Sequence, residues 1–506
     1  MNSVGRRNLA RLAEEARERH GDYPAVSFDG EWLGSGELFS RAGRLAVGLS
    51  ERGIGPGDRV VVTMENSPDV LVVYDAVFRA GAVIVPAIFL LTADELRRIV
   101  SDSGAVAVVT SPALRQTVDA ATSGIEGLRL VVSLGAELEA LEATDPGPIV
   151  GRDDDDLAAL VYTGGTTGRS KGVMLSHANL WEAGRQGQAV GYVPGVRRGL
   201  TCLPLSHSYG LLVLGVSRHA LEPPETVLMR WFDAGSWLSL AAAHRVQIAA
   251  LVPSMLERLL SAPLERFDLS SLQAVVSGAA PLSRRSAEEF MARVPGVEVR
   301  EGYGLTETAA LCAANPPGKL RLGTVGPPVP GTEIRLLDDG GAEVGRDEAG
   351  EICVRSAHVM VGYWNEPQLS ERALLGGWLR TGDIGRLDEA GYLSIVDRKK
   401  DLILRGGFNV FPSDVEEVLI SHPDVTAACV LGRPDPLHGE EVVGFVTLKD
   451  GSTTGPDELI ACSRTRLAAY KYPREIHVLD ALPLTLVGKA DRRALRQMLT
   501  EQGGTT

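Results

Sequence analysis

The strongest constraint on the fold is an alternation of short apolar runs with longer segments of helical periodicity, which begins near residue 59. Val60–Thr63 and Ala82–Pro86 are short apolar runs, whereas Pro68–Arg79 and Ala93–Asp102 repeat apolar residues at helical spacing. Strands joined by helices in this order run parallel, and the helices cover the faces of the sheet. The pattern therefore predicts a largely parallel α/β unit.

The same alternation returns after Asp156 and predicts a second α/β unit. Leu157–Tyr162, Gln247–Val252 and Leu272–Val276 are apolar runs typical of buried strands, and Ser283–Val294 has the spacing of a helix. A chain of 506 residues is too long for one ordinary core, because domains usually span roughly 100–200 residues. Several packed units are therefore expected.

A change of pattern between roughly residues 323 and 396 predicts a small β-rich subdomain. The short runs Glu333–Leu337, Gly350–Val354 and Gly391–Val396 are separated by Gly, Asp and Pro turns. The predicted fold class is α/β: a large N-terminal domain (residues 1–396) of two α/β subdomains plus this β-rich one, followed by a mobile α+β C-terminal lid (residues 397–506).

The predicted hinge is Asp397, which opens a dense charge run between the β-rich subdomain and the lid. The first lid helix is predicted to start at Ser413, because Ser413 and Glu416 have the spacing of a capping box. Val415, Val418 and Leu419 are expected to face inward, and Pro423 marks the end of this helix.

Charge and cysteine content exclude several functional classes. The formal charge of −14 argues against a broad electropositive surface for nucleic acid or anionic lipid. No uninterrupted apolar run reaches the about 18 residues of a membrane span. Five scattered cysteines without a CxxC pair suit a reducing compartment, so the cytoplasm is the expected location.

The sharpest chemical signal is Tyr162–Gly172, a Gly/Thr-rich loop directly after a predicted buried strand. Glycines allow close backbone approach, threonines offer hydroxyl donors, and Lys171 supplies a positive charge, so the loop suits a polyphosphate. It matches neither GxxxxGK[ST] nor GxGxxG, which removes support for a generic P-loop NTPase or a Rossmann dinucleotide site.

This loop resembles the phosphate-binding signature of the adenylate-forming superfamily, which comprises acyl-CoA synthetases, firefly-type luciferases and peptide-synthetase adenylation domains. Further motifs of that superfamily follow in the expected order over almost the whole chain. They are Pro204–Gly210, Ser277–Leu282, Tyr303–Glu307, Thr381–Asp383, Asp397-Arg398 and Gly488-Lys489. The resemblance is nearest to free-standing acyl-CoA ligases, and it implies ATP, Mg2+ and coenzyme A as cofactor and co-substrates.

The resemblance implies that Tyr303 stacks on adenine, Thr306 contacts phosphate and Glu307 holds Mg2+. Asp383 is expected to accept the ribose hydroxyls and Arg398 to approach ribose or phosphate. The full set expected to bind ATP or the adenylate is Thr163, Gly164, Gly165, Thr166, Thr167, Gly168, Lys171, Gly278, Ala279, Ala280, Gly302, Tyr303, Gly304, Asp383 and Arg398.

Three further groups are assigned by the same resemblance. Lys489 is expected to neutralise the substrate carboxylate and the α-phosphate during adenylation. His207, Tyr209 and Gly210 are expected to border the acyl pocket, with His207 as a gate that counts among the catalytic residues. The segment expected to wall the pantetheine tunnel of coenzyme A is Gly406, Gly407 and Phe408.

The expected reaction converts a hydrophobic carboxylic acid, through an acyl-adenylate, to its CoA thioester. Leu211, Leu212 and Val213 beside the gate, with Leu251 and Val252, suggest an apolar acyl chamber that has no obvious arginine for a second carboxylate. Asp233 is better explained as a helix cap than as an amino-group ligand, so amino-acid activation is disfavoured.

Several alternatives stay open at this point. Many relatives carry Ser at the position of Gly164 and Pro at that of Ser170, so an enzyme that only thioesterifies a preformed adenylate is one alternative. An acyl-AMP ligase that loads a carrier protein and a non-catalytic adenylate-binding relative are others. A homodimer is the base-rate expectation for the assembly.

Overall fold

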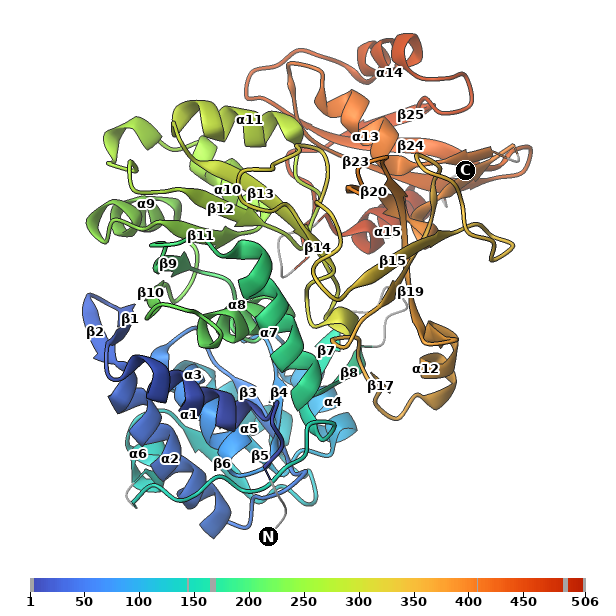
Figure 1. Cartoon of the computed structure of the whole chain (residues 1–506). Helices are drawn as coiled ribbons and strands as arrows, with labels where there is room; N and C mark the ends of the chain where they lie inside the picture. The colour runs from blue at the N-terminus through green and yellow to red at the C-terminus, as the bar shows by residue number, and fades with distance from the viewer. Residues whose placement is uncertain (1–3, 143–144, 164–169, 407, 486–489, 504–506) are drawn as a thin grey trace. The chain divides into compact units, whose positions relative to one another are not determined.

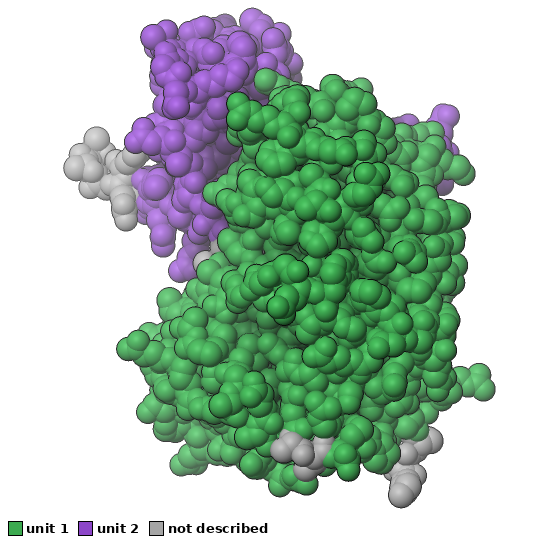
Figure 2. Space-filling view, turned by 90° about the vertical axis from the view of Figure 1, so that its left-hand side faces the viewer, with its two compact units in different colours: residues 1–334, 354–379 green, residues 335–353, 380–506 purple. Residues whose placement is uncertain are grey.

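The computed structural model describes residues 4–142, 145–163, 170–406, 408–485 and 490–503 (Figure 1). The chain divides into two compact units, which Figure 2 colours separately. Unit 1 comprises residues 1–334 and 354–379, and unit 2 comprises residues 335–353 and 380–506. The mixed α/β fold with a large N-terminal and a small C-terminal part confirms the predicted fold class.

A seven-stranded sheet in unit 1 realises the first predicted α/β unit. In spatial order its strands are β17 (Gly362–Tyr363), β8 (Lys171–Ser176), β7 (Leu157–Thr163), β4 (Val83–Pro86), β3 (Arg59–Thr63), β5 (Ala107–Thr110) and β6 (Leu130–Ser133). The strands from β7 to β6 run parallel, whereas β8 and β17 are antiparallel to their neighbours. Its intervening helices are α3 (Pro68–Arg79), α4 (Ala93–Ser103), α5 (Arg115–Thr122) and α6 (Ala136–Leu141).

An eight-stranded sheet in unit 1 contains two of the strands predicted for the second α/β unit, whereas the third, Leu157–Tyr162, lies in the seven-stranded sheet as part of β7. In spatial order its strands are β14 (Ala313–Ala314), β13 (Glu298–Tyr303), β12 (Ala274–Ser277), β11 (Ile248–Leu251), β9 (Arg198–Thr201), β10 (Glu225–Leu228), β1 (Pro24–Phe28) and β2 (Glu31–Gly34). All neighbours from β13 to β1 are parallel. The helices of this part are α1 (Leu9–His20), α2 (Ser35–Glu51), α7 (His177–Gly191), α8 (Ser208–Arg218), α9 (Ala234–Ala243), α10 (Pro253–Leu260) and α11 (Arg284–Arg293).

Helices α7 and α8 pack against each other (Figure 1). A pair of glycines, one from each helix, lies at their contact. A Cβ on Gly184 of α7 would lie only 2.7 Å from the carbonyl carbon of Gly215 in α8, so the two backbones are nearly in contact. Asp233 caps α9 by accepting the N–H of Ser236 at 2.8 Å, which confirms the helix-cap interpretation. The glycine pair therefore allows the close packing on α7 of α8, the helix that begins within the Pro204–Gly210 motif.

The predicted β-rich segment forms a five-stranded sheet. Its strands are β15 (Glu333–Leu337), β16 (Gly350–Arg355), β19 (Trp378–Leu387), β18 (Leu374–Leu375) and β20 (Leu393–Arg398), with α12 (Pro367–Ala373) nearby in sequence. The chain passes between the two units within β15, β16 and β19. Strand β20 begins later than the predicted run and continues through Asp397 and Arg398.

The remainder of unit 2 is an α+β fold around a second five-stranded sheet. Its strands are β22 (Phe408–Val410), β21 (Ile403–Arg405), β24 (Gly439–Leu448), β23 (Val425–Asp435) and β25 (Glu475–Val478), and its helices are α13 (Pro412–Ile420), α14 (Pro456–Arg466) and α15 (Arg492–Gly503). Phe445 is fully buried in the core between this sheet and α15.

The predicted capping box at Ser413 is wrong. Helix α13 starts at Pro412, and its N-cap Phe411 makes no side-chain cap bond. The Ser413 hydroxyl donates to the Val396 carbonyl, and Glu416 accepts the N–H of Val430 and the guanidinium of Arg492. Ser413 and Glu416 therefore bond to residues that are distant in sequence, and neither side chain caps the helix.

Candidate active site

Three of the predicted site motifs follow the carboxyl ends of strands in the eight-stranded sheet. The Pro204–Gly210 motif follows β9, Gly278–Ala280 follow β12, and Gly304–Glu307 follow β13. In the parallel register Ser277 pairs with Glu301, so neighbouring strand ends lie at one edge of the sheet. This edge is where open parallel sheets bind ligands.

His207 and Tyr209 are fixed at the start of α8. His207 is the N-cap, and its Nδ1 accepts the N–H of Tyr209 at 3.2 Å, which assigns the proton of the neutral ring to Nε2. The Tyr209 hydroxyl donates to the Val276 carbonyl at 2.9 Å, and burial raises the pKa of Tyr209. The Tyr209 hydroxyl therefore stays protonated and is committed to that carbonyl. Gly210 lets this turn pack against the carbonyl of Pro204.

The Tyr303–Glu307 segment is held by a close backbone approach. A Cβ on Gly304 would lie 2.3 Å from the carbonyl of Ala310, so the chain can return on itself only with glycine at this position. Thr306 and Glu307 then lie in a short 3-10 turn, Thr306–Thr308. The Thr306 hydroxyl donates to Ser208 Oγ at 3.2 Å, which joins this motif to the start of α8.

The seven-stranded sheet carries Lys171, the cation expected to bind phosphate. Thr163 ends β7 and pairs with Lys171, the first residue of β8, while the Ser170 hydroxyl donates to the Thr163 carbonyl at 2.9 Å. Lys171 Nζ lies 5.5 Å from the centroid of the Tyr363 ring. The Tyr363 hydroxyl donates to Glu307 Oε1 at 2.8 Å. One tyrosine therefore contacts both the cation of the loop and the carboxylate expected to hold Mg2+.

Tyr363 was not identified from the sequence. The available signal was the pair Tyr363-Trp364 in a Gly-Tyr-Trp-Asn segment, whose aromatic residues fit a short strand as well as a site. Ser208, which accepts the hydrogen bond from Thr306, lay inside the Pro204–Gly210 motif but was not singled out. Neither contact is visible in the sequence, because each joins segments that lie far apart along the chain.

The residues present fit a magnesium ion. Glu307 offers a partly exposed carboxylate, and Thr306 places a hydroxyl beside it. Mg2+ prefers oxygen ligands, and it is usually bound through one or two carboxylates together with substrate phosphates and waters. The Glu307 carboxylate could therefore be the only protein side chain that coordinates the ion, if substrate phosphates and waters supply the other ligands.

Asp383, Arg398 and Asp397 lie together in unit 2. Asp383 in β19 faces Arg398 in β20, with Oδ1 3.3 Å from the Arg398 Nε. Asp397 accepts the N–H of Arg398 at 2.7 Å and that of Ser413 at 2.9 Å, and burial raises the pKa of the Asp397 carboxyl. Asp397 thus ties the end of β20 to the start of α13, at the predicted hinge.

The segment expected to contact coenzyme A lies between β21 and β22 in unit 2. Gly406 adopts a positive φ of 58° and donates its N–H to the His438 carbonyl at 2.7 Å, which attaches the turn to the tip of the β23–β24 hairpin. The ring of Phe408 stacks on Tyr470, with centroids 4.7 Å apart. Phe408 is 56% exposed, so one ring face remains open to a ligand.

Comparison with known proteins identifies the family. The AMP-binding enzyme family matches residues 13–364, and the AMP-binding enzyme C-terminal domain matches residues 414–489. The chain belongs to the AMP-binding enzyme family. It is an AMP-forming acid–thiol ligase, which uses ATP, Mg2+ and coenzyme A.

Relatives of this AMP-binding enzyme match it over nearly its whole length. A feruloyl-CoA synthase of Amycolatopsis sp is 37% identical over 94% of this chain and 95% of the relative. A long-chain-fatty-acid–CoA ligase of Yersinia pestis is 34% identical over 98% and 95%. The crystal structure of ATP-bound MatB from Rhodopseudomonas palustris has a TM-score of 0.90 at 32% identity, covering 97% of this chain and 98% of that one.

Several residues that the resemblance singled out lie outside the part of the chain that the structure describes. They are Gly164, Gly165, Thr166, Thr167 and Gly168 of the phosphate loop, Gly407 of the coenzyme A segment, and Lys489. Their expected roles stay predictions.

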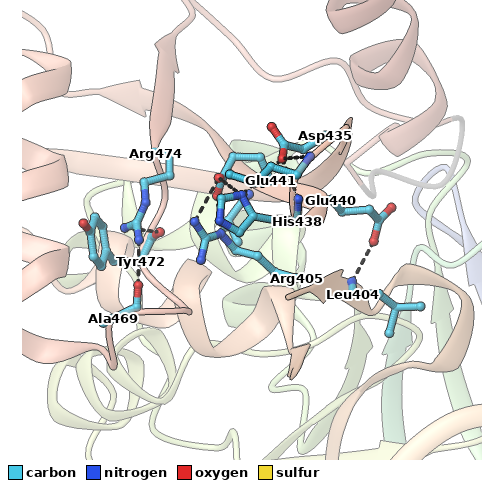
Figure 3. Close-up of polar contacts among 11 residues, drawn as sticks. Leu404, Arg405, Asp435, His438, Glu440, Glu441, Ala469, Tyr472 and Arg474 are labelled. Carbon is cyan, nitrogen blue, oxygen red and sulfur yellow. Dashed lines mark hydrogen bonds and ion pairs between the residues drawn. The ribbon is translucent and has the colours of Figure 1, made fainter. Parts of the chain in front are cut away.

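A polar cluster adjoins the segment that is expected to contact coenzyme A in this AMP-binding enzyme (Figure 3). Arg405 is 9% exposed and donates to both carboxylate oxygens of Glu441, at 2.6 and 3.0 Å. Leu404 donates its N–H to Glu440 at 2.7 Å. These bonds and the Gly406 bond fix β21 and its turn to β24.

The same cluster contains a triad, Asp435, His438 and Glu441, whose ligand atoms lie within 4.8 Å of one another. Asp435 Oδ1 already accepts the N–H groups of Leu437 and His438, and Glu441 is bound by Arg405 (Figure 3). The Arg405 guanidinium supplies the positive charge that a cation would supply there. We interpret the triad as an ion-pair network that shapes the hairpin tip.

Among the described residues, no helix has both the length and the apolar character needed to cross a membrane.

Proposed function

We propose that this ligase activates a hydrophobic monocarboxylic acid as its acyl-adenylate and transfers the acyl group to coenzyme A. The observation that carries the proposal is the convergence at one edge of unit 1: Lys171, Tyr363 and Glu307 on one side, Thr306 and Ser208 beside them, and then His207 at the start of apolar helix α8. Phosphate chemistry and an apolar acyl group would meet there.

The acyl side of this arrangement favours a substrate with a single carboxylate. Leu211 and Leu212 continue α8 beyond the gate and are buried with Leu311. The one cation of α8, Arg218, is bound to Asp75 and is therefore not offered to a second substrate carboxylate. The relatives named feruloyl-CoA synthase and long-chain-fatty-acid–CoA ligase support hydrophobic acids, with aryl and long-chain acids as the first candidates.

The proposed roles follow the chemistry of each side chain. Lys171, Thr306 and Lys489 would hold the phosphates, and Tyr303 would stack on adenine. Asp383 would accept the ribose hydroxyls, and Arg398 would approach them. Mg2+ held by Glu307 would neutralise charge on the phosphates while the substrate carboxylate attacks the α-phosphorus and pyrophosphate leaves.

The second half-reaction needs no covalent enzyme intermediate. The thiol of coenzyme A attacks the acyl carbon of the mixed anhydride, and AMP leaves. Gly406 and Phe408 would flank the pantetheine arm, and His207 would gate the passage between adenylate and thiol. All five cysteines lie in the described part of the chain and are free thiols, in keeping with the proposed cytoplasmic location.

The test is CoA thioester formation, followed by mass spectrometry across a panel of aryl and fatty acids. Each acid is supplied with ATP and Mg2+, or as its preformed acyl-adenylate. Product from free acid plus ATP supports the complete ligase. Product only from adenylates replaces it with a thioesterification-only enzyme. Adenylate that is transferred to a phosphopantetheine carrier protein but not to CoA replaces it with a carrier-loading ligase.

Lys489→Ala is the internal control of that experiment. Removal of its charge should abolish product from acid plus ATP and spare product from preformed adenylate, because the cation is proposed to act only on the charge that develops in adenylation. Equal losses in both reactions would contradict that role. Light scattering on the same sample tests the proposed homodimer.

A further inference from the structure

Tyr363 touches two charged groups that both serve the first half-reaction. Its hydroxyl donates to Glu307 Oε1 at 2.8 Å, and its ring face receives Lys171 Nζ at 5.5 Å from the centroid. The side chain is nearly buried, at 9% exposure. The contact with Glu307 joins strand β17 of one sheet to the turn that follows β13 of the other.

The backbone around Tyr363 is anchored on every side. Its N–H donates to Ser370 Oγ at 2.8 Å, and the N–H groups of Val361 and Trp364 donate to carbonyls of β8 at 2.9 and 2.8 Å. The neighbouring Met360 N–H donates to the Glu307 carbonyl at 2.8 Å. Glu307 is therefore attached to this segment through both its main chain and its side chain, and the phenol cannot drift from the carboxylate.

A phenol at this position restricts how the carboxylate can rotate. Because the hydroxyl engages Oε1, the torsion of the Glu307 side chain is set before any metal arrives, and Oε2 is left to coordinate. Without that bond a glutamate keeps several rotamers, which must be given up on binding. The ring meanwhile offers its electron-rich face to Lys171, which limits the positions of the ammonium.

We propose that Tyr363 is a positioning residue for adenylation: it presets Glu307 to bind the magnesium ion of MgATP and seats Lys171 beside the phosphates. The proposal rests on the proposed function, and it extends it by assigning the coupling of the metal ligand and the phosphate-loop cation to one side chain. Thioester formation from a preformed adenylate involves neither MgATP nor pyrophosphate, so Tyr363 has no part in that step.

Metal binding by the full-length protein tests this without turnover. Mn2+ serves as the probe, its free signal is followed by electron paramagnetic resonance, and a non-hydrolysable ATP analogue with a methylene bridge between the α- and β-phosphorus is present. Tyr363→Phe keeps the ring and removes only the hydroxyl. Mn2+ should bind the variant about tenfold more weakly, the usual scale for a hydrogen bond to a charged group. Binding of the analogue without metal should be unchanged.

Tyr192→Phe is the matched control, because Tyr192 also donates its hydroxyl to a glutamate, Glu222 at 3.4 Å, away from the site motifs. It should bind Mn2+ like the parent protein. A general loss of stability would lower metal binding and thioester formation together, whereas the proposal predicts that Tyr363→Phe retains thioester formation from preformed adenylate. Higher Mg2+ should restore part of its pyrophosphate exchange.

Equal Mn2+ affinity in Tyr363→Phe and the parent protein would overturn the proposal, as would a loss in adenylation that extra Mg2+ does not reduce. These outcomes are distinct from failure of the proposed function. If the parent protein makes no adenylate from any acid, the metal titration still reports whether Tyr363 presets Glu307.

Discussion

Arg398 and Asp383 face each other across the β19–β20 pair, with Nε 3.3 Å from Oδ1. The Asp383 side chain is only 7% exposed, whereas that of Arg398 is 47% exposed. An ion pair with one partner this exposed contributes little stability. The carboxylate is therefore held in place by its surroundings, and the guanidinium can leave it for a ribose or phosphate group at small cost.

Asp383→Asn is expected to raise the KM for ATP about tenfold, because the carboxylate is proposed to accept ribose hydroxyls and a charge-assisted bond is stronger than a neutral one. The parent enzyme should show a similar penalty with 2′,3′-dideoxy-ATP. The KM of the variant should be almost the same for ATP and for the dideoxy nucleotide. If the KM increases caused by the substitution and by the dideoxy nucleotide multiply when the two are combined, Asp383 does not contact the ribose.

Gly304→Ala is expected to abolish adenylation and to lower the melting temperature. Its Cβ would lie 2.3 Å from the Ala310 carbonyl, which is backbone and cannot move aside like a flexible side chain. Gly302→Ala is the matched control from the same motif, because there the nearest atom, the Ala313 carbonyl oxygen, would lie 3.6 Å away. Thermal unfolding should separate the two variants. Similar melting temperatures would show that the turn can relax.

Glu301 predicts a pH dependence of stability. Burial raises the pKa of this carboxyl to about 7 from an ordinary value of 4.5, although N–H donors from Gly323 and Leu282 act in the opposite direction. Between these pH values the native state keeps a proton that the unfolded state loses. Stability from this group is therefore complete below about pH 4.5 and is lost as the pH rises through 7, by up to about 3 kcal/mol.

Glu301→Gln should remove that loss. The melting temperature of the variant relative to the parent protein should rise from pH 5 to pH 8. Exposed Glu289→Gln, on helix α11, is the control and should show no such trend. A difference between Glu301→Gln and the parent protein that does not change with pH would mean that the native carboxyl titrates normally.

Arg405→Met is expected to destabilise unit 2 by about 3–5 kcal/mol, because it leaves the Glu441 carboxylate, 8% exposed, without its charged partner. The double variant Arg405→Met with Glu441→Leu should recover much of this loss. Since Arg405 adjoins Gly406, the single variant should also raise the KM for coenzyme A. Chemical unfolding and thioester kinetics provide the two measurements.

The control for that pair is Arg284→Met on helix α11, where the Arg284–Glu288 ion pair has side chains 70% and 50% exposed. Its effect should stay within about 0.5 kcal/mol. Comparable losses at Arg405 and Arg284 would mean that burial does not strengthen the dependence of Glu441 on its partner.

Local patterns predicted the elements well where one residue's neighbours in sequence decide its conformation. The helix Pro68–Arg79 was predicted with its observed bounds, and the Asp233 cap was identified correctly. The Ser413 capping box failed because its two side chains bond to Val396, Val430 and Arg492, which are distant in sequence. A cap motif shows that a side chain is able to cap a helix. Whether it does so depends on the other hydrogen-bond partners that the tertiary structure brings near it.

The sequence by itself determined the motifs, their order along the chain and many of the helices and strands. Glycine turns, apolar periodicity and short motifs are local properties, so they can be read without the fold. Only the tertiary structure decided that Tyr363 contacts both Glu307 and Lys171, and that Ser208 contacts Thr306. The contacts of Tyr363 depend on strand β17 pairing with β8 in one register, and a slip of one residue would turn Tyr363 to the other face of the sheet. Register is set by the packing of the whole sheet, which no single segment of the sequence contains.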